Sequence, residues 1–276
     1  MRRRPEDLYL DLMKQTLSFG LWPEPPFPID TFNYRRPIFK KLAVSLISRV
    51  LRSKRLQLVE QRTFGPDQRE EGMIWPVYAE TMIGLKRLDN LRFCVETVIR
   101  EHIEGDLIET GVWRGGACIF MRAVLAAHGI KDRKVYVADS FEGLPKPDPE
   151  EFPADQGDRF HKHSYLAVSK EDVAYNFSKY GLLDDQVVFL KGWFKDTLPQ
   201  APIEKLSILR LDGDMYGSTM DALKNLYPKL LSGGFCIIDD YALPRCKSAV
   251  DDYRAKQKIN SEMKQIDWTG RYWRKE

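Results

Sequence analysis

From about residue 85 onward, short apolar runs alternate with amphipathic segments, and this alternation constrains the fold more than any other feature. The runs cover 106–109, 135–138, 187–190, 206–211 and 235–238. Segments with helical spacing lie around them, at 89–101, 117–127, 170–180, 218–230 and 246–256. Continuous apolar strands separated by helices require a parallel sheet that is covered on both faces. The pattern therefore predicts an α/β domain with a doubly wound, mostly parallel, Rossmann-like sheet.

The N-terminal part of the chain lacks this alternation and is rich in proline, aromatic and then basic residues. Between 39 and 55, apolar residues recur at helical spacing, and lysine and arginine supply the other faces. The apolar stripe of such a helix can pack on its own domain, on a second subunit or on an anionic membrane, and we expect packing on protein. We divide the chain into an appendage over 1–80 and the α/β domain over 81–276.

Charge and cysteine content exclude several classes of function. With 43 basic and 40 acidic side chains the formal net charge is only +3, so we expect no nucleic-acid partner. The four cysteines form no Cys-x-x-Cys pair and the first residues do not resemble a signal peptide, which favours a cytoplasmic protein. No stretch of membrane-spanning length lacks a charge, so we expect no stable insertion into a membrane.

The first apolar run ends in a glycine-rich turn that directly precedes a helix. Glu109, Thr110 and Gly111 open this turn, and Gly115 and Gly116 close it. Glycines let a ligand approach the backbone, and the start of a helix offers the positive end of its dipole. The spacing is not the Gly-x-Gly-x-x-Gly of dinucleotide sites, so a ligand without a pyrophosphate fits better. A purely structural turn is the alternative.

Two more candidate binding positions follow the second and third runs. Asp139, next to Ser140, can accept hydrogen bonds from both hydroxyls of a ribose, or it can be the N-cap of a helix. Gly192 and Trp193 end the third run, where an aromatic ring can lie against a nucleobase or simply pack at the rim.

Four carboxyl groups follow the fourth and fifth runs: Asp212, Asp214, Asp239 and Asp240. Crowded like charges raise each other's pKa and are unfavourable unless a cation lies among them. Neither segment offers His or Cys, so the oxygen ligands favour Mg²⁺. Asp212 and Asp214 point the same way if extended, so one can bind metal while the other faces a substrate. Solvated loop acids are the alternative interpretation.

The flanking polar residues allow two further interpretations. Ser218 with Asp221 resembles a capping box for the helix expected at 218–230. His161 and His163 lie in a polar loop after the second run, where they can act as a proton acceptor at the cleft or simply face solvent.

Together these motifs resemble the macrocin O-methyltransferase family, also called the TylF/MycF family. The resemblance is carried by ETGVWRGG at 109–116, DSFEGLP at 139–145, GWFKDTLP at 192–199, LDGDMY at 211–216 and IDDY at 238–241. It implies a class I methyltransferase fold in which the N-terminal appendage acts as a helical lid. It also implies transfer of a methyl group from S-adenosylmethionine to a sugar hydroxyl of a natural-product glycoside, assisted by Mg²⁺.

The resemblance also implies residue roles. Asp212, Asp239 and Asp240 would bind the metal, and Asp214 would be the general base, with Asp212 beside it in the catalytic pair. The residues expected to bind the methyl donor are Met82, Glu109, Thr110, Gly111, Asp139, Ser140, Gly192, Trp193 and Asp212. Members of the family tend to form homodimers, and their N-terminal segment helps to cover the active site.

Two other classes of function remain possible. A nicotinamide-dependent oxidoreductase can use the same sheet, although the glycine spacing disfavours it. A non-catalytic module can use the basic helix at 39–55 to bind a membrane surface or a partner. If the metal assignment is right, Asp239→Ala is expected to abolish Mg²⁺-dependent turnover with little effect on folding.

Overall fold

A central sheet of seven strands organises the computed structural model, which describes residues 4–32 and 36–276. The strands are β3 (Asp106–Thr110), β4 (Val135–Asp139), β5 (Val187–Lys191), β6 (Leu206–Leu211), β7 (Leu230–Ile238), β8 (Lys264–Gln265) and β9 (Arg271–Arg274). Their order is β5-β4-β3-β6-β7-β9-β8. The strands β3, β4, β5, β6 and β7 are parallel to one another, and β9 is antiparallel to both of its neighbours, β7 and β8. The predicted doubly wound, mostly parallel sheet is confirmed, whereas β8 and β9 were not predicted.

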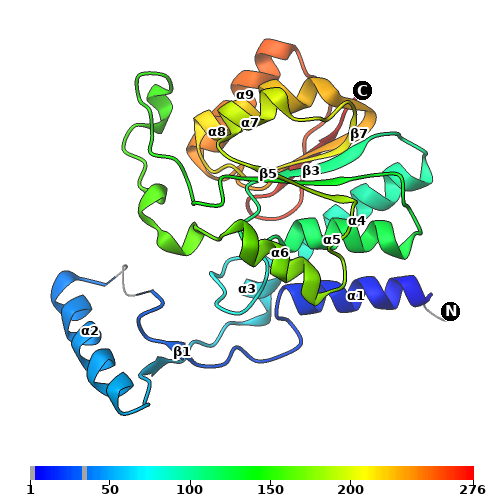
Figure 1. Ribbon diagram of the computed structural model, residues 1–276. Helices are drawn as coiled ribbons and strands as arrows, with labels where there is room; N and C mark the ends of the chain where they lie inside the picture. The colour runs from blue at the N-terminus through cyan, green and yellow to red at the C-terminus, as the bar shows by residue number, and fades with distance from the viewer. Residues whose placement is uncertain (1–3, 33–35) are drawn as a thin grey trace.

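Helices cover both faces of the sheet (Figure 1). One face carries α4 (Leu85–Arg100), α5 (Gly116–Ala127) and α6 (Lys170–Lys179), and the other carries α7 (Phe194–Thr197), α8 (Tyr216–Leu226) and α9 (Pro244–Gln257). Neighbouring residues of one strand enter different cores, as Leu107 and Ile108 of β3 do. This two-sided burial explains why the strands read as continuous apolar runs.

Short 3-10 turns complete the connections, at Pro153–Asp155, Phe160–Lys162, Ser164–Leu166, Leu198–Gln200 and Tyr227–Lys229. The first three belong to the long segment between β4 and α6. The chain leaves β3 toward β4 on one side and later returns to β6 on the other side. Above the carboxyl ends of β3 and β6 the connections diverge, and ligands bind at such a switch point in open sheets.

Part of the N-terminal region belongs to the main body. The helix α1 (Pro5–Leu17), which was not predicted, packs on α5 and α4 and buries Leu10, Met13 and Leu17 in the same core. A further short helix, α3 (Pro66–Glu70), precedes α4. The division of the chain at residue 80 stays a prediction, and α1 shows that the region before it contributes to the core.

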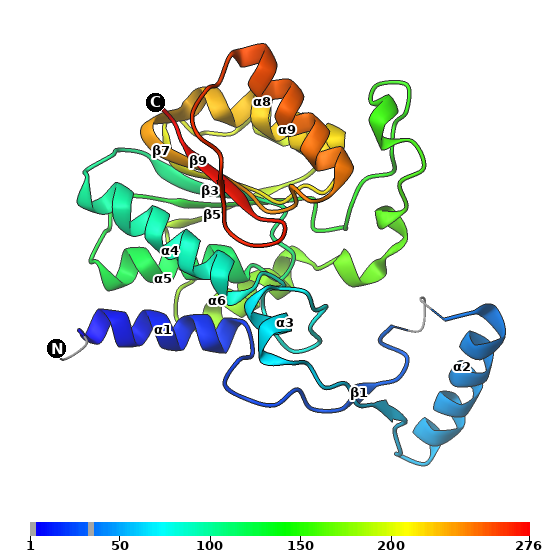
Figure 2. The same cartoon turned by 180° about the vertical axis from the view of Figure 1, so that it is seen from behind.

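The basic amphipathic helix forms an arm that stands away from the body (Figures 1 and 2). This helix, α2 (Ile38–Ser53), lies beyond a small antiparallel pair of strands, β1 (Phe27–Pro28) and β2 (Val59–Glu60). Its apolar stripe does not pack on its own domain, because Phe39, Leu42 and Leu46 are each about two-thirds exposed. The buried residue of the helix is Ser48. Within the described parts of the chain, no helix is both long and apolar enough to cross a bilayer.

Candidate active site

A cavity of about 570 Å³ lies at the carboxyl ends of the parallel strands. It brings together eight of the predicted site residues: Met82, Gly111, Asp139, Ser140, Gly192, Trp193, Asp212 and Asp214. Glu109 and Thr110 do not line it, and both are buried in β3 at the base of the glycine-rich turn. Asp239 and Asp240 lie outside its lining as well. The predicted motifs therefore converge on one hollow, which lies at the switch point of the sheet.

Close backbone approach explains the glycine-rich turn. Gly111 has a φ of +84°, and a Cβ atom there would lie 1.8 Å from the backbone oxygen of Asp212. Gly115 has a φ of +85° at the start of α5. Both positions favour glycine because other residues are strained at positive φ. The turn thus lies directly against the exit of β6, and the proposed ligand contact at this turn stays a prediction.

Asp139 ties this turn to the exit of β4. Its Oδ2 accepts a hydrogen bond from the Val112 N–H at 2.8 Å, and its Oδ1 accepts one from the Phe141 N–H at 2.7 Å. The chain from 140 to 152 is not helical, so the alternative of a helix N-cap is wrong. Burial raises the pKa of this carboxyl group, although the backbone donors favour its charged form.

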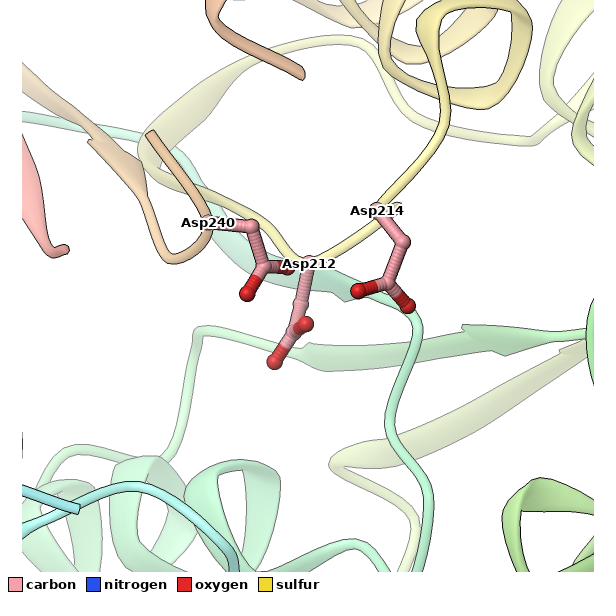
Figure 3. A group of neighbouring side chains, drawn as sticks. All are labelled: Asp212, Asp214 and Asp240. Carbon is pink, nitrogen blue, oxygen red and sulfur yellow. The ribbon is translucent and has the colours of Figure 1, made fainter. Parts of the chain in front are cut away.

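Three carboxylates meet beside the cavity. Asp212 and Asp214 follow β6, and Asp240 follows β7; Figure 3 shows the three side chains pointing to the same side of their loops. One oxygen of each residue lies within 4.8 Å of the corresponding oxygens of the other two. Asp240 Oδ2 is buried and has no hydrogen-bond partner among the described residues. The sequence pattern predicts that all four carboxylates gather, and the structure brings these three of them together.

The cluster is electrostatically unfavourable on its own. Burial, followed by repulsion from Asp212, raises the pKa of Asp214 to about 8. Burial and the charge of Asp239 raise the pKa of Asp212 to about 6. Burial also raises the pKa of Asp240 well above its usual range. A hard dication would offset this repulsion, and its preferred ligands are carboxylate oxygens such as these.

Asp239, although adjacent in sequence, faces a different environment. Arg87 Nη1 donates to its Oδ2 at 2.6 Å, and Arg210 Nη2 donates to its Oδ1. Burial alone would raise the pKa of Asp239, but the two guanidinium groups outweigh it and lower the pKa. The structure therefore groups Asp214 with Asp212 and Asp240, and it directs Asp239 toward the arginines. Each oxygen of Asp239 retains a second lone pair, so its role as a metal ligand stays a prediction.

Strand register explains why Arg210 occupies the centre of these charges. Arg210 pairs with Glu109 of β3, and Ile237 of β7 is its partner on the other side. Asp212 and Asp239 each lie two residues beyond these positions, so their side chains point to the same face of the sheet. Sequence reasoning missed Arg210, although a single charged residue in an otherwise apolar strand indicates buried acidic partners.

The start of α8 differs from the prediction. The helix begins at Tyr216, so Ser218 is not its cap. Instead, Asp155 from the long loop accepts hydrogen bonds from the N–H groups of Tyr216 at 2.8 Å and Gly217 at 2.9 Å. A Cβ atom at Gly217 would lie 2.6 Å from the ring of Phe152, so glycine permits this contact. The cap comes from about 60 residues earlier in the chain, and local sequence contained no signal for it.

The two histidines separate in the structure. His161 lines the cavity, whereas His163 does not and its ring lies against Trp75 and Phe160. His161 therefore stays a candidate for contact with a ligand. A role of His163 as a proton acceptor stays a prediction.

Substitution of Asp239 tests the ion-pair arrangement. From the sequence alone, replacing Asp239 is expected to have little effect on folding. The ion pairs of Asp239 with Arg87 and Arg210 lead us to expect a loss of stability instead. Asp239→Asn removes a buried charge from between two guanidinium groups, and we expect it to lower the free energy of unfolding by about 3 to 5 kcal/mol. Denaturant unfolding, followed by circular dichroism in the presence of EDTA, measures this loss.

Asp240→Asn is the matched control because it also replaces a carboxylate of the same turn. It removes repulsion within the cluster and breaks no ion pair, so we expect an unchanged or higher free energy of unfolding in EDTA. Equal destabilisation by the two substitutions would contradict the different environments of Asp239 and Asp240.

Comparison with known proteins identifies the family. The family model described as Macrocin-O-methyltransferase (TylF) matches residues 6–275. The 8-demethyl-8-(2,3-dimethoxy-alpha-L-rhamnosyl)-tetracenomycin-C 4'-O-methyltransferase of Streptomyces olivaceus is 50% identical over 275 residues, which cover 99% of this chain and 95% of that protein. Mycinamicin III 3''-O-methyltransferase of Micromonospora griseorubida is 52% identical over 221 residues, covering 79% of this chain and 87% of that protein.

Solved structures agree with this assignment. The O-methyltransferase NovP superposes with a TM-score of 0.83 at 47% identity, covering 98% of this chain and 99% of that one. The calicheamicin methyltransferase CalS11 is 16% identical with a TM-score of 0.56, covers 99% of this chain and 94% of that one, and supports the fold alone. The chain has the class I methyltransferase fold, and it belongs to the macrocin O-methyltransferase family of S-adenosylmethionine-dependent sugar O-methyltransferases.

Proposed function

We propose that this protein transfers a methyl group from S-adenosylmethionine to a sugar hydroxyl of a natural-product glycoside, and that the reaction requires Mg²⁺. The convergence of Asp212, Asp214 and Asp240 beside the cavity is the observation that carries the proposal. Two relatives are named for methylation at a 4' and a 3'' oxygen, on a rhamnosyl tetracenomycin and on mycinamicin III. A sugar hydroxyl is thus the class of acceptor that the relatives support.

The cavity offers a binding surface for the methyl donor. Asp139 at the end of β4 would hold the ribose hydroxyls, and Trp193 would lie against the adenine. Lining residues Met82, Gly111, Ser140 and Gly192 would form the rest of this surface. Glu109 and Thr110 would support it from below, since Glu109 accepts hydrogen bonds from Arg210 and from the Cys118 thiol. The donor supplies an electrophilic methyl group bound to a sulfonium. When the methyl group is transferred, the sulfur leaves as a neutral thioether and needs no acid.

The carboxylate cluster fits a hard dication. Asp212 and Asp240 would bind it through oxygen, and the unpartnered Oδ2 of Asp240 is an available ligand atom. Asp239 would be a third ligand through its remaining lone pairs. When bound, the cation supplies a Lewis acid that lowers the pKa of an alcohol and fixes its position.

The remaining work falls to side chains of this chain. Asp214 would accept the proton of the acceptor hydroxyl as general base, since it lies beside Asp212 and lines the cavity. Phe152, Leu144 and Trp113 line the same cavity and would exclude water from the aligned oxygen, methyl carbon and sulfur. His161 would contact the acceptor at this wall.

Product analysis tests the proposed reaction. We expect purified protein, S-adenosylmethionine and a rhamnosyl glycoside to give a methylated product by mass spectrometry in Mg²⁺. EDTA is expected to abolish the product, and added Mg²⁺ to restore it. Turnover that is indifferent to EDTA would contradict the metal assignment. Saturable binding of a nicotinamide dinucleotide without binding of S-adenosylmethionine would instead favour the oxidoreductase.

Asp214→Asn tests the general base. Because the amide cannot accept the hydroxyl proton as a carboxylate does, we expect kcat to fall by about 10² to 10⁴. The Kd for S-adenosylmethionine, measured by calorimetry, is expected to stay close to that of the wild type. A wild-type kcat would remove Asp214 from the mechanism.

We also propose a homodimer that covers the apolar face of α2. Ile38, Phe39, Leu42 and Leu46 on this arm are all more than 60% exposed, and such contiguous apolar surface indicates a protein interface. The N-terminal region would also serve as a lid, since the carbonyl groups of Val77 and Ala79 near its end accept hydrogen bonds from Arg114 in the glycine-rich turn.

Light scattering after size exclusion tests the dimer. We expect the wild type to have the mass of two chains and the double variant Leu42→Glu, Leu46→Glu to have the mass of one. Arg49→Gln, which alters an exposed polar position of the same helix, is the control and should stay dimeric. A monomeric wild type that binds anionic vesicles in a salt-sensitive way would instead support the membrane-surface alternative.

The proposed cellular setting is the reducing cytoplasm. Cys94, Cys118, Cys236 and Cys246 are all free and buried. Burial raises the pKa of each thiol, so each stays neutral and packs as a small apolar side chain.

A further inference from the structure

Behind the carboxylate cluster lie two buried arginines, Arg87 and Arg210, to which the proposed chemistry assigns no role. We propose that Arg87 and Arg210 are positioning residues that hold Asp239 and thereby turn Asp240 toward the cation. In this way they set the affinity of the site for its metal. The inference rests on the proposed cation site and assigns no contact between either arginine and the substrate.

Arg210 fixes the carboxylates of three strands. Its side chain is 1% exposed, and its Nη1 donates both to Glu109 and, at 3.1 Å, to Asp212 Oδ2. Its Nη2 donates to Asp239 Oδ1. A guanidinium group presents its donors in one rigid plane, so these carboxylates are held in a fixed relation. Arg210 thus links the carboxylates of β3 and of the exits of β6 and β7.

Arg87 fixes Asp239 from the opposite side and connects it to the C-terminal turn. From α4, its Nη1 donates to Asp239 Oδ2 at 2.6 Å and its Nε donates to Asp267 Oδ2 at 2.8 Å. Asp267 Oδ1 in turn accepts hydrogen bonds from the N–H groups of Thr269 and Gly270. A Cβ atom at Gly270 would lie 3.2 Å from the Arg87 side chain, so the turn closes tightly on the arginine.

The backbone transmits this constraint to Asp240. The Asp239 N–H donates to the Leu211 carbonyl at 2.9 Å, and the Asp239 carbonyl accepts a hydrogen bond from Thr269 Oγ1 at 3.1 Å. The Asp240 carbonyl accepts one from the Leu243 N–H at 2.8 Å. Asp239 and Asp240 lie just beyond the end of β7, so this exit turn, with Asp239 fixed at its side chain and its backbone, sets the direction of the Asp240 side chain. Asp240 therefore faces Asp212 and Asp214.

Electrostatics explains why such a constraint is required. Repulsion within the cluster favours rotation of Asp240 away from Asp212 and Asp214 whenever no cation is bound. If the Asp240 carboxylate had to rotate back when the cation binds, the affinity for the cation would fall, whereas a carboxylate that is already in place avoids this loss. The two arginines keep the ligand in place, and they also neutralise Asp239 beside it.

The test compares two arginines of the same helix. Arg87→Lys keeps the positive charge but cannot reach Asp239 and Asp267 with a planar fork. Arg92→Lys is the matched control, because Arg92 also lies on α4 and binds three carboxylates, of Asp7, Asp11 and Glu96. The Kd for Mn²⁺ is measured by calorimetry on the full chain, without acceptor, and the Kd for S-adenosylmethionine is measured in parallel.

We expect Arg87→Lys to raise the Kd for Mn²⁺ by about 10- to 100-fold, the usual effect of losing a residue that orients a metal ligand. The Kd for S-adenosylmethionine should stay close to the wild-type value, and Arg92→Lys should leave both constants unchanged. In turnover, Arg87→Lys should raise the Mg²⁺ concentration for half-maximal rate while kcat recovers at saturating Mg²⁺. A general loss of stability would not weaken the affinity for metal while leaving kcat at saturating Mg²⁺ unchanged.

Four outcomes would overturn the inference. A folded Arg87→Lys variant with the wild-type Kd for Mn²⁺ would refute it, and so would equal weakening by Arg87→Lys and Arg92→Lys. If Arg87→Lys does not fold, Asp267→Asn takes its place, since it removes one carboxylate partner of Arg87, and a wild-type Kd for Mn²⁺ would again refute the inference. Absence of saturable Mn²⁺ binding by the wild type would overturn the proposed cation site and the inference together.

Discussion

Mutual repulsion of carboxylates, gathered where two parallel strands end, is the constraint on which the rest of this structure depends. Asp212, Asp214 and Asp240 approach within 4.8 Å of one another through single oxygens, and burial raises the pKa of each. A stable protein does not keep such a group without compensation. Two buried arginines supply part of it, and a dication would supply the rest.

The need to pair these buried carboxylates with positive charge explains features of the structure that are otherwise unrelated. A charged residue, Arg210, is the last but one of the otherwise apolar strand β6 because Glu109, Asp212 and Asp239 all need a positive partner. The C-terminal turn at Gly270 lies against α4 because Asp267 shares Arg87 with Asp239. The antiparallel strand β9 follows this turn directly, so the edge of the sheet and the charge network form one unit.

Features set by local periodicity could be predicted from the sequence. The apolar runs identified all five parallel strands, and the positions of Asp139, Asp212 and Asp214 at strand ends placed them at the cavity. Long-range partners could not be predicted in this way. Arg87 binds residues 152 and 180 positions away, and no local pattern encodes that pairing.

The orientation of α2 likewise could not be predicted from local sequence. Its amphipathic spacing was evident, but spacing does not say which body covers an apolar face. Leu42 and Leu46 face away from the domain, and Ser48 is buried instead. The wall of the cavity beside α8 is equally dependent on long-range contacts, because Asp155 and Phe152 reach α8 from a loop with little regular structure.

Locating a bound cation directly is the most decisive test of the proposed metal site. Crystals grown with Mn²⁺ and S-adenosylhomocysteine allow the metal to be placed by its anomalous scattering. We expect one strong peak in contact with oxygens of Asp212 and Asp240, with Arg87 and Arg210 still bound to Asp239. A site without anomalous signal at saturating Mn²⁺, or a metal held elsewhere in the cavity, would contradict the proposed site.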